Sequence, residues 1–203
     1  LSFKDDFLKG NATELSTELE KESKKDPDRF SELGLKFTTE VHPYYYSAIL
    51  RGLRESGIVK DKVFEVIRHF FSFPEKPGAR WIPDLIKEYS KEDIPEDILA
   101  IVGWLATKAE DPENDEITSY RINGTEDDYP NDLFGKAINS IRGSAAEAIG
   151  RLLADNKERI SFFIPFLNKM IKDSTVTVRT TVACALLGLY IHNEEHAVDL
   201  FIK

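Results

Sequence analysis

Cysteine is nearly absent from this sequence: Cys184 is the one cysteine among 203 residues. A single thiol excludes a disulfide framework, and a zinc site built from cysteines, within the chain. Long apolar runs are lacking as well, since none approaches the roughly 18 consecutive apolar residues that a membrane-spanning helix requires. The chain also has no G-x-x-x-x-G-K-S/T motif, so it carries no P-loop nucleotide site. We therefore expect no membrane contact and no bound cofactor.

Positive charge is in short supply too. Lys and Arg number 27 against 36 Asp and Glu, which gives a net charge of −9. This balance makes nucleic acid an unsuitable partner, because duplex binding depends on neutralising phosphates. No secretory signal pattern is visible, and together with the lone cysteine this predicts a cytoplasmic protein. The chain starts at Leu1 and stops inside an apolar-periodic run that begins near Glu194, so we expect a fragment of a longer protein.

Helical periodicity extends along most of the chain. Proline follows Asp26, His42 and Ile94, at the first position of a helix in each case. Apolar residues then recur at spacings of three and four. The pattern predicts an all-α protein with helices starting near residues 27 and 95, and over residues 44–55, 59–71, 81–89, 141–153, 160–171 and 176–191. Asn123-Gly124 leaves open a minimal hairpin between polar flanks.

The last helices repeat. At an offset of 37 residues, Ile141-Arg142 falls on Val178-Arg179, and apolar character is kept at each inward position. Small side chains, which let neighbouring helices approach closely, recur at the same offset. A repeat of this kind is typical of helix pairs that stack on one another.

A family resemblance rests on the same residues. The stretch from Asp173 to Val178-Arg179, followed by Ala183-Cys-Ala-Leu-Leu187, resembles the second half of a HEAT repeat. The resemblance implies an α-solenoid of stacked antiparallel helix pairs, as one domain over residues 1–203. It also implies that Asp173 and Arg179, with Arg142 from the preceding repeat, form a ladder that ties adjacent repeats. The clearest repeats span 136–203, and 26–110 holds divergent helix pairs. Lys136 stands where the preceding repeat would carry its Asp.

A second resemblance concerns Asn139 to Ile149, which follows an acidic segment, with Asp28-Arg29-Phe30 and His42-Pro43 upstream. This arrangement is similar to the C-terminal helical region of bacterial NACHT/STAND-type ATPases. In that family a nucleotide-binding module is coupled to a solenoid that senses a ligand. The resemblance implies that the chain is a sensor or regulatory arm of such an ATPase.

The acidic segment is the strongest compositional anomaly. Residues 110–132 hold nine acids and one base. We expect a long loop over 110–135, since mutual repulsion of its charges disfavours burial. Three interpretations stay open: a solvated insertion, a surface for a basic partner, and a calcium site. The residues singled out for an interaction are Asp111, Asp115, Glu116, Glu126, Asp127 and Asp128.

Other motifs have plain structural explanations. His192-Asn-Glu-Glu-His196 matches the H-x-x-E-H pattern of some zinc proteases, but a turn capped by Asn193 would separate the two imidazoles. Tyr44 to Tyr46 could stack on bases only if they shared a face, and successive helical residues lie about 100° apart. Cys184 is expected to be an inert core thiol.

The sequence thus predicts a non-catalytic helical-repeat module that binds and scaffolds another protein, or other domains of its own chain. No catalytic or metal residues are assigned. The regulatory arm of an ATPase is the first alternative. A HEAT-like DNA glycosylase, with Trp81 and Trp104 as its aromatic residues, is the second.

Overall fold

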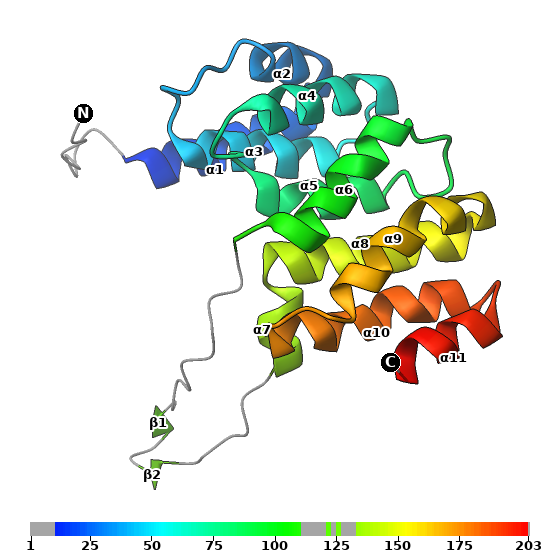
Figure 1. Ribbon diagram of the computed structural model, residues 1–203. Coiled ribbons are helices and arrows are strands. Elements are labelled where there is room, and N and C mark those ends of the chain that lie inside the picture. Colours follow the sequence, from blue (N-terminus) through cyan, green and yellow to red (C-terminus); the bar gives the residue numbers. More distant parts are fainter. Residues whose placement is uncertain (1–10, 111–120, 123–124, 127–132, 203) are drawn as a thin grey trace. The chain divides into compact units, whose positions relative to one another are not determined.

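The computed structural model of the chain describes residues 11–110, 121–122, 125–126 and 133–202 (Figure 1). Helix dominates these residues, which confirms the predicted all-α class. The chain divides into two compact units, over residues 1–101 and 102–203, with the boundary inside one helix. The stacking of helix pairs into a solenoid stays a prediction.

The first unit contains six of the helices named in Figure 1. They are α1 (Ala12–Lys25), α2 (Pro27–Gly34), α3 (Pro43–Arg54), α4 (Lys60–Ser72), α5 (Ile82–Lys87) and the first part of α6 (Glu96–Lys108), with a 3-10 turn, η1 (Ala79–Trp81). Side chains cap the N-termini of the early helices. Asn11 accepts from the Glu14 N–H at 2.9 Å, and His42 Nδ1 accepts from the Tyr44 N–H at 3.3 Å. Pro27 and Pro43 lie in the first turn of α2 and α3, where their missing N–H costs little because the first backbone N–H groups of a helix have no partner within it.

The core of this unit forms where α1 and α3 pack side by side. Gly52 makes this possible, because a Cβ there would lie 2.4 Å from the Cβ of Ser23. Tyr46 is fully buried and its hydroxyl donates to the Thr38 carbonyl. Most of the other buried side chains are apolar, and the largest group comes from α3, α4, α5 and α6, among them Ile49, Leu50, Leu53, Phe64, Ile67, Phe70, Leu85 and Ile98.

An ion pair between α4 and α6 makes unit 1 sensitive to acid. Arg68 Nε lies 2.5 Å from Asp97 Oδ2, and this hydrogen bond lowers the pKa of the Asp97 carboxyl. A lowered carboxyl pKa stabilises the fold above the ordinary value of about 3.9, and the contribution is lost as pH falls through the folded-state pKa. Both side chains are half exposed, so the effect is at most about 1 kcal/mol.

We therefore expect Asp97→Asn to lower the free energy of unfolding slightly at neutral pH and to have no effect in strong acid. Urea unfolding of the variant and the parent chain at both pH values measures this difference. Glu40→Gln, at an exposed acid of the same unit, is the control. An equal loss at both pH values would show that the carboxylate charge contributes nothing.

The second unit begins with the rest of α6 and ends with α11. It contains β1 (Arg121–Ile122), β2 (Thr125–Glu126), α7 (Leu133–Ile138), α8 (Ile141–Asp155), η2 (Lys157–Arg159), α9 (Ile160–Met170), α10 (Val176–Tyr190) and α11 (Glu194–Ile202). The two strands pair antiparallel, with Arg121 opposite Glu126 and Ile122 opposite Thr125. This pairing agrees with the minimal hairpin that the sequence left open, although Asn123-Gly124 itself lies outside the described residues.

The predicted helix bounds are close to the observed ones, and the helix predicted over 81–89 is observed as the shorter α5 (Ile82–Lys87). Gly78 adopts a left-handed conformation with φ of 75°, and η1 follows it before α5 begins. Pro83, in the first turn of α5, is compatible with a helix that starts after Trp81. Helices α1 and α7 were not predicted from the sequence.

Helices α8 and α10 form the tightest packing in unit 2. A Cβ on Gly188 would lie 2.0 Å from the Gly150 carbonyl oxygen, and one on Gly150 would lie 2.4 Å from that of Cys184. The two backbones therefore touch at these glycines. Around the contact, most side chains that the repeat pattern placed inward are buried, and Ile141 and Ala183 are only partly buried. The buried ones are Ala145, Ala146, Ala148, Ile149, Leu152, Val178, Val182, Ala185, Leu186 and Leu189.

Candidate interaction site

Two predicted ladder residues meet where α8 and α10 begin. Arg142 is the second residue of α8, and Asp173 lies in the turn before α10. The Arg142 guanidinium forms an ion pair with the Asp173 carboxylate, and only 12% and 14% of the two side chains is exposed. The other carboxylate oxygen, Oδ1, accepts from the Thr175 N–H at 2.9 Å. Asp173 therefore shapes its own turn and also ties α8 to the turn before α10.

Arg179 takes a different part. Its Nη1 donates to the backbone carbonyls of Asp173 and Ser174, and the second bond measures 3.1 Å. Arg179 is exposed, and among the described residues it forms no ion pair. The structure thus brings all three ladder residues together, but the carboxylate of Asp173 serves Arg142 and only the backbone of the turn serves Arg179.

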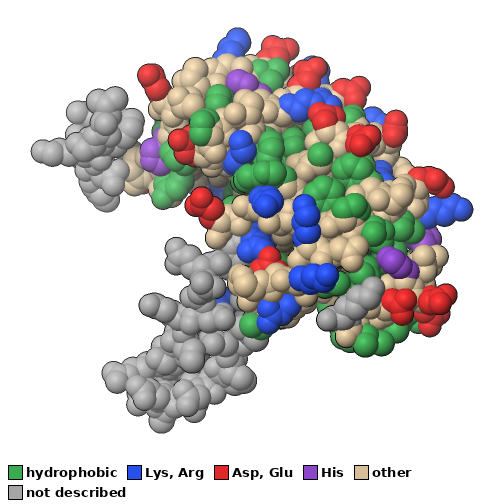
Figure 2. All heavy atoms as spheres, in the orientation of Figure 1, with side chains coloured by type: hydrophobic (Ala, Val, Ile, Leu, Met, Phe, Trp, Pro, Cys, Tyr) green, Lys and Arg blue, Asp and Glu red, His purple; other side chains and the backbone are tan. Residues whose placement is uncertain are grey.

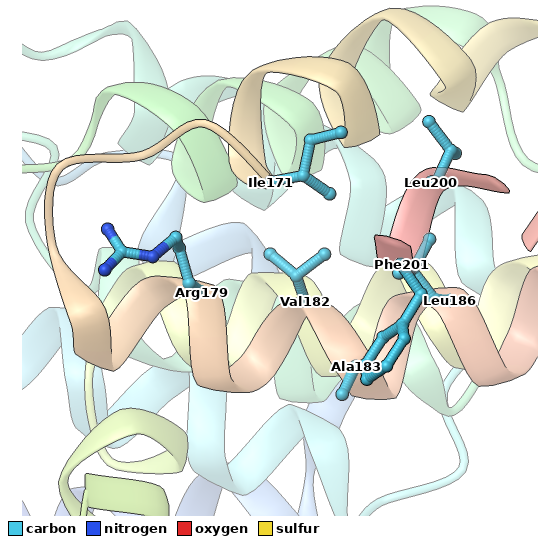
Figure 3. Close-up of a pocket in the computed structure, with 7 residues that line it drawn as sticks. All are labelled: Ile171, Arg179, Val182, Ala183, Leu186, Leu200 and Phe201. Carbon is cyan, nitrogen blue, oxygen red and sulfur yellow. The ribbon is translucent and has the colours of Figure 1, made fainter. Parts of the chain in front are cut away.

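An apolar groove starts beside Arg179 (Figure 3). It encloses about 290 Å³ between the end of α9, one face of α10 and the end of α11. In the figure, Val182 rises from α10 toward Ile171, Leu186 lies beside Leu200 and Phe201, and Arg179 stands at the opposite end from Phe201. The groove is lined by Ile171, Arg179, Val182, Ala183, Leu186, Leu200 and Phe201.

Large apolar side chains stay in solvent around this groove. Leu187 is 67% exposed and Phe201 is 71% exposed, although both lie on helices that pack against the rest of unit 2. Figure 2 shows hydrophobic side chains on this part of the surface, bordered by acidic ones. We call this area the α10–α11 surface; its exposed apolar members are Leu187, Tyr190, Ile191, Val198, Phe201 and Ile202.

The repeat pattern pointed to Arg179 but missed α11. Leu200 and Phe201 belong to the apolar run that begins near Glu194, which the sequence showed as an unfinished helix. Helical spacing alone does not say which apolar residues find a neighbour and which stay exposed.

The H-x-x-E-H motif is divided between two elements. His192 lies in the turn after α10, and its Nε2 is 3.0 Å from the Ala154 carbonyl oxygen. Asn193 caps the N-terminus of α11, since its Oδ1 accepts from the backbone N–H of His196 at 3.1 Å. The imidazole of His192 thus has a backbone partner, whereas the buried Nε2 of His196 has no hydrogen-bond partner among the described residues. Within the described ranges, no three His, Cys, Asp or Glu side chains gather as metal ligands would.

The tyrosine run is also divided. Tyr46 is buried in the core, whereas Tyr44 is 51% exposed and packs its ring edge-on against His42. The run therefore offers no common face for stacking.

Cys184 lies partly buried on α10. Burial raises the pKa of its thiol, and the charge of Glu147 raises it further. We expect iodoacetamide to alkylate Cys184 of the folded chain more slowly than a free thiol, with a rate that rises only above the ordinary cysteine pKa of about 8.5. Mass spectrometry over a pH series measures the rate, and the chain unfolded in urea is the control. Equal rates in the folded and unfolded chains would contradict both the burial of the thiol and its raised pKa.

The acidic segment is only partly described. Asp111, Asp115, Glu116, Asp127 and Asp128 lie outside the described residues, so their proposed interaction is a prediction from sequence. Glu126 lies in β2, where its backbone pairs with Arg121.

Comparison with known proteins adds no family. No family model matches the chain, and neither the curated proteins nor the solved structures contain a significant match. Among the helices that the structure describes, none is both long enough and apolar enough to cross a membrane.

Proposed function

We propose that this chain is a non-catalytic helical-repeat module that binds another protein, or other domains of its own chain, through the α10–α11 surface. The observation that carries the proposal is the exposure of Leu187 and Ile191 at α10 and of Phe201 on α11, where Phe201 also lines an apolar groove between these helices. Scattered apolar side chains are normal on a protein surface, but a contiguous group around a groove is typical of a protein-binding site.

The construction of unit 2 supports this role. Helix α10 lies at the centre of the unit's packing, since it contacts α7, α8, α9 and α11, and α8 most extensively. Each added helix in such an arrangement covers part of the preceding one and presents a new face. The last face has no further helix among the described residues, and its aromatic and aliphatic side chains are of the kind that anchor protein interfaces.

Affinity capture with surface variants tests the proposal. The double variant Leu187→Ser/Phe201→Ser removes two exposed anchors without touching the core. Leu15→Ser/Val59→Ser is the matched control, since these residues of unit 1 are 59% and 64% exposed. We expect the parent chain and the control to retain the same partner from a lysate of the source cells, and the surface variant to lose it. Retention by all three chains, or by none, would contradict the proposal.

If the chain is the regulatory arm of an ATPase, this same module would be one part of that larger protein. This alternative and the DNA glycosylase both stay predictions from sequence.

A further inference from the structure

We propose that the α10–α11 surface receives an α-helix of a partner protein, that this helix runs parallel to α10, and that an aspartate in the turn before it pairs with Arg179. This inference deepens the proposed binding function by naming the chemistry of the partner. It rests on a comparison of α8 with α10, two helices of the same chain that are related by the 37-residue repeat.

Helix α8 shows how such a face is covered. Three of its residues, spaced four apart and so on one face, meet the next helix; we call them the α8 stripe: Arg142, Ala146 and Gly150. Arg142 pairs with Asp173 in the turn before α10, and Gly150 touches the α10 backbone at Cys184 and Gly188. Ala146 is fully buried. Because the first contact lies at the start of both helices and the second further along both, α8 and α10 run in the same direction.

Helix α10 carries the copy of this stripe. At the 37-residue offset the α8 stripe falls on a second set of residues, the α10 stripe: Arg179, Ala183 and Leu187. Leu187 is 67% exposed, Arg179 is exposed, and Ala183 lines the groove at its edge. The same face that α10 covers on α8 is therefore open on α10 itself.

Arg179 sets the charge of the occupant. Its guanidinium is held toward the turn by two backbone carbonyls through Nη1 only, so Nε and Nη2 keep donors for an incoming group. Lys169 and Lys172 are exposed just before and after the groove residue Ile171. Asp173, the acid nearest to Arg179 in sequence, is already paired with Arg142. The open end of the groove therefore favours a carboxylate.

Leu187 sets the shape of the occupant. Gly150 at the equivalent place in α8 lets the α10 backbone approach to contact, whereas Leu187 presents a full side chain. A partner helix must therefore lie further from α10 than α10 lies from α8, or it must offer a small residue opposite Leu187. In either case it fills the groove with an apolar side chain. This difference makes the surface more suited to a helix of another protein than to a second copy of α10.

A displayed library of helical peptides, each as long as residues 172–190, tests the proposal. The peptides vary in the turn and on the helix face, and they are selected on the folded parent chain. We expect the selected sequences to carry an acid in the turn before an apolar face. Arg179→Gln should weaken their binding about tenfold, which corresponds to roughly 1.4 kcal/mol. Arg151→Gln, on exposed α8 surface, is the matched control and should leave binding unchanged.

Charge exchange makes the assignment specific. Arg179→Asp should abolish binding of the acidic peptide and restore it for the same peptide with Lys in place of its acid. Leu187→Ser should also weaken binding, and thermal unfolding of each variant shows that the fold is kept.

Besides a failure of the selection itself, three results would overturn the inference. They are selected peptides without an acid, binding that is insensitive to both Arg179 and Leu187, and sedimentation showing that the surface joins two copies of the chain. A failure to select any peptide also overturns it. The proposed function is judged separately, by capture of a whole protein that depends on Leu187 and Phe201.

Discussion

Replacing Gly188 by alanine is expected to lower the free energy of unfolding of the 102–203 unit by roughly 3 kcal/mol. The added Cβ would lie 2.0 Å from the carbonyl oxygen of Gly150. That atom belongs to the α8 backbone, so no side-chain rotation relieves the clash, and the two helices must separate.

The sign of the change in the free energy of unfolding shows whether α8 and α10 touch at Gly188. In a helix without tertiary contacts, Gly→Ala is stabilising by about 1 kcal/mol, because alanine is the better helix former. A destabilisation at Gly188 therefore reports the contact with α8 and nothing else. Urea unfolding followed by circular dichroism gives the change in free energy, and amide hydrogen exchange along α10 locates it in unit 2.

Leu187→Ala is the control, since it lies next to Gly188 on the same helix and is 67% exposed. A change within about 0.5 kcal/mol is expected there. If Gly188→Ala stabilised the chain, α8 and α10 would not touch at this point.

Replacing Asp173 by asparagine is expected to cost about 3 kcal/mol, the range seen when one partner of a buried ion pair is removed. Asparagine is nearly the same size and keeps an oxygen that can accept from the Thr175 N–H. The variant therefore removes the negative charge that pairs with the largely buried guanidinium of Arg142.

A double-mutant cycle separates the pair from other effects. Arg142→Gln and Asp173→Asn together should cost less than the sum of the two single changes, because the pair is lost only once. Arg151→Gln serves as the control; Arg151 pairs with Asp155, but 53% of its side chain is exposed, and a loss below about 1 kcal/mol is expected. Additive losses in the cycle would show that Arg142 and Asp173 do not interact.

The sequence by itself determined where most helices lie and which of their residues correspond to one another. Proline after Asp26 and His42, and apolar residues at spacings of three and four, are local signals, so most of the helices were predicted without their neighbours, although α1 and α7 were not. The 37-residue repeat singled out Arg142, Asp173 and Arg179 as related residues. Local signals of this kind survive in one sequence because they depend on the backbone of a few consecutive residues.

Only the tertiary structure decided how the related residues divide their contacts. Asp173 carries one carboxylate, and its place between α8 and α10 gives that charge to Arg142 rather than to Arg179. The same holds for exposure: Val182 is buried and Leu187 is in solvent, although both are apolar residues of one helix. A helix face becomes core or surface according to what packs on it, and that depends on residues distant in the chain. The open face of α10, on which the proposed function rests, is for this reason a property of the fold.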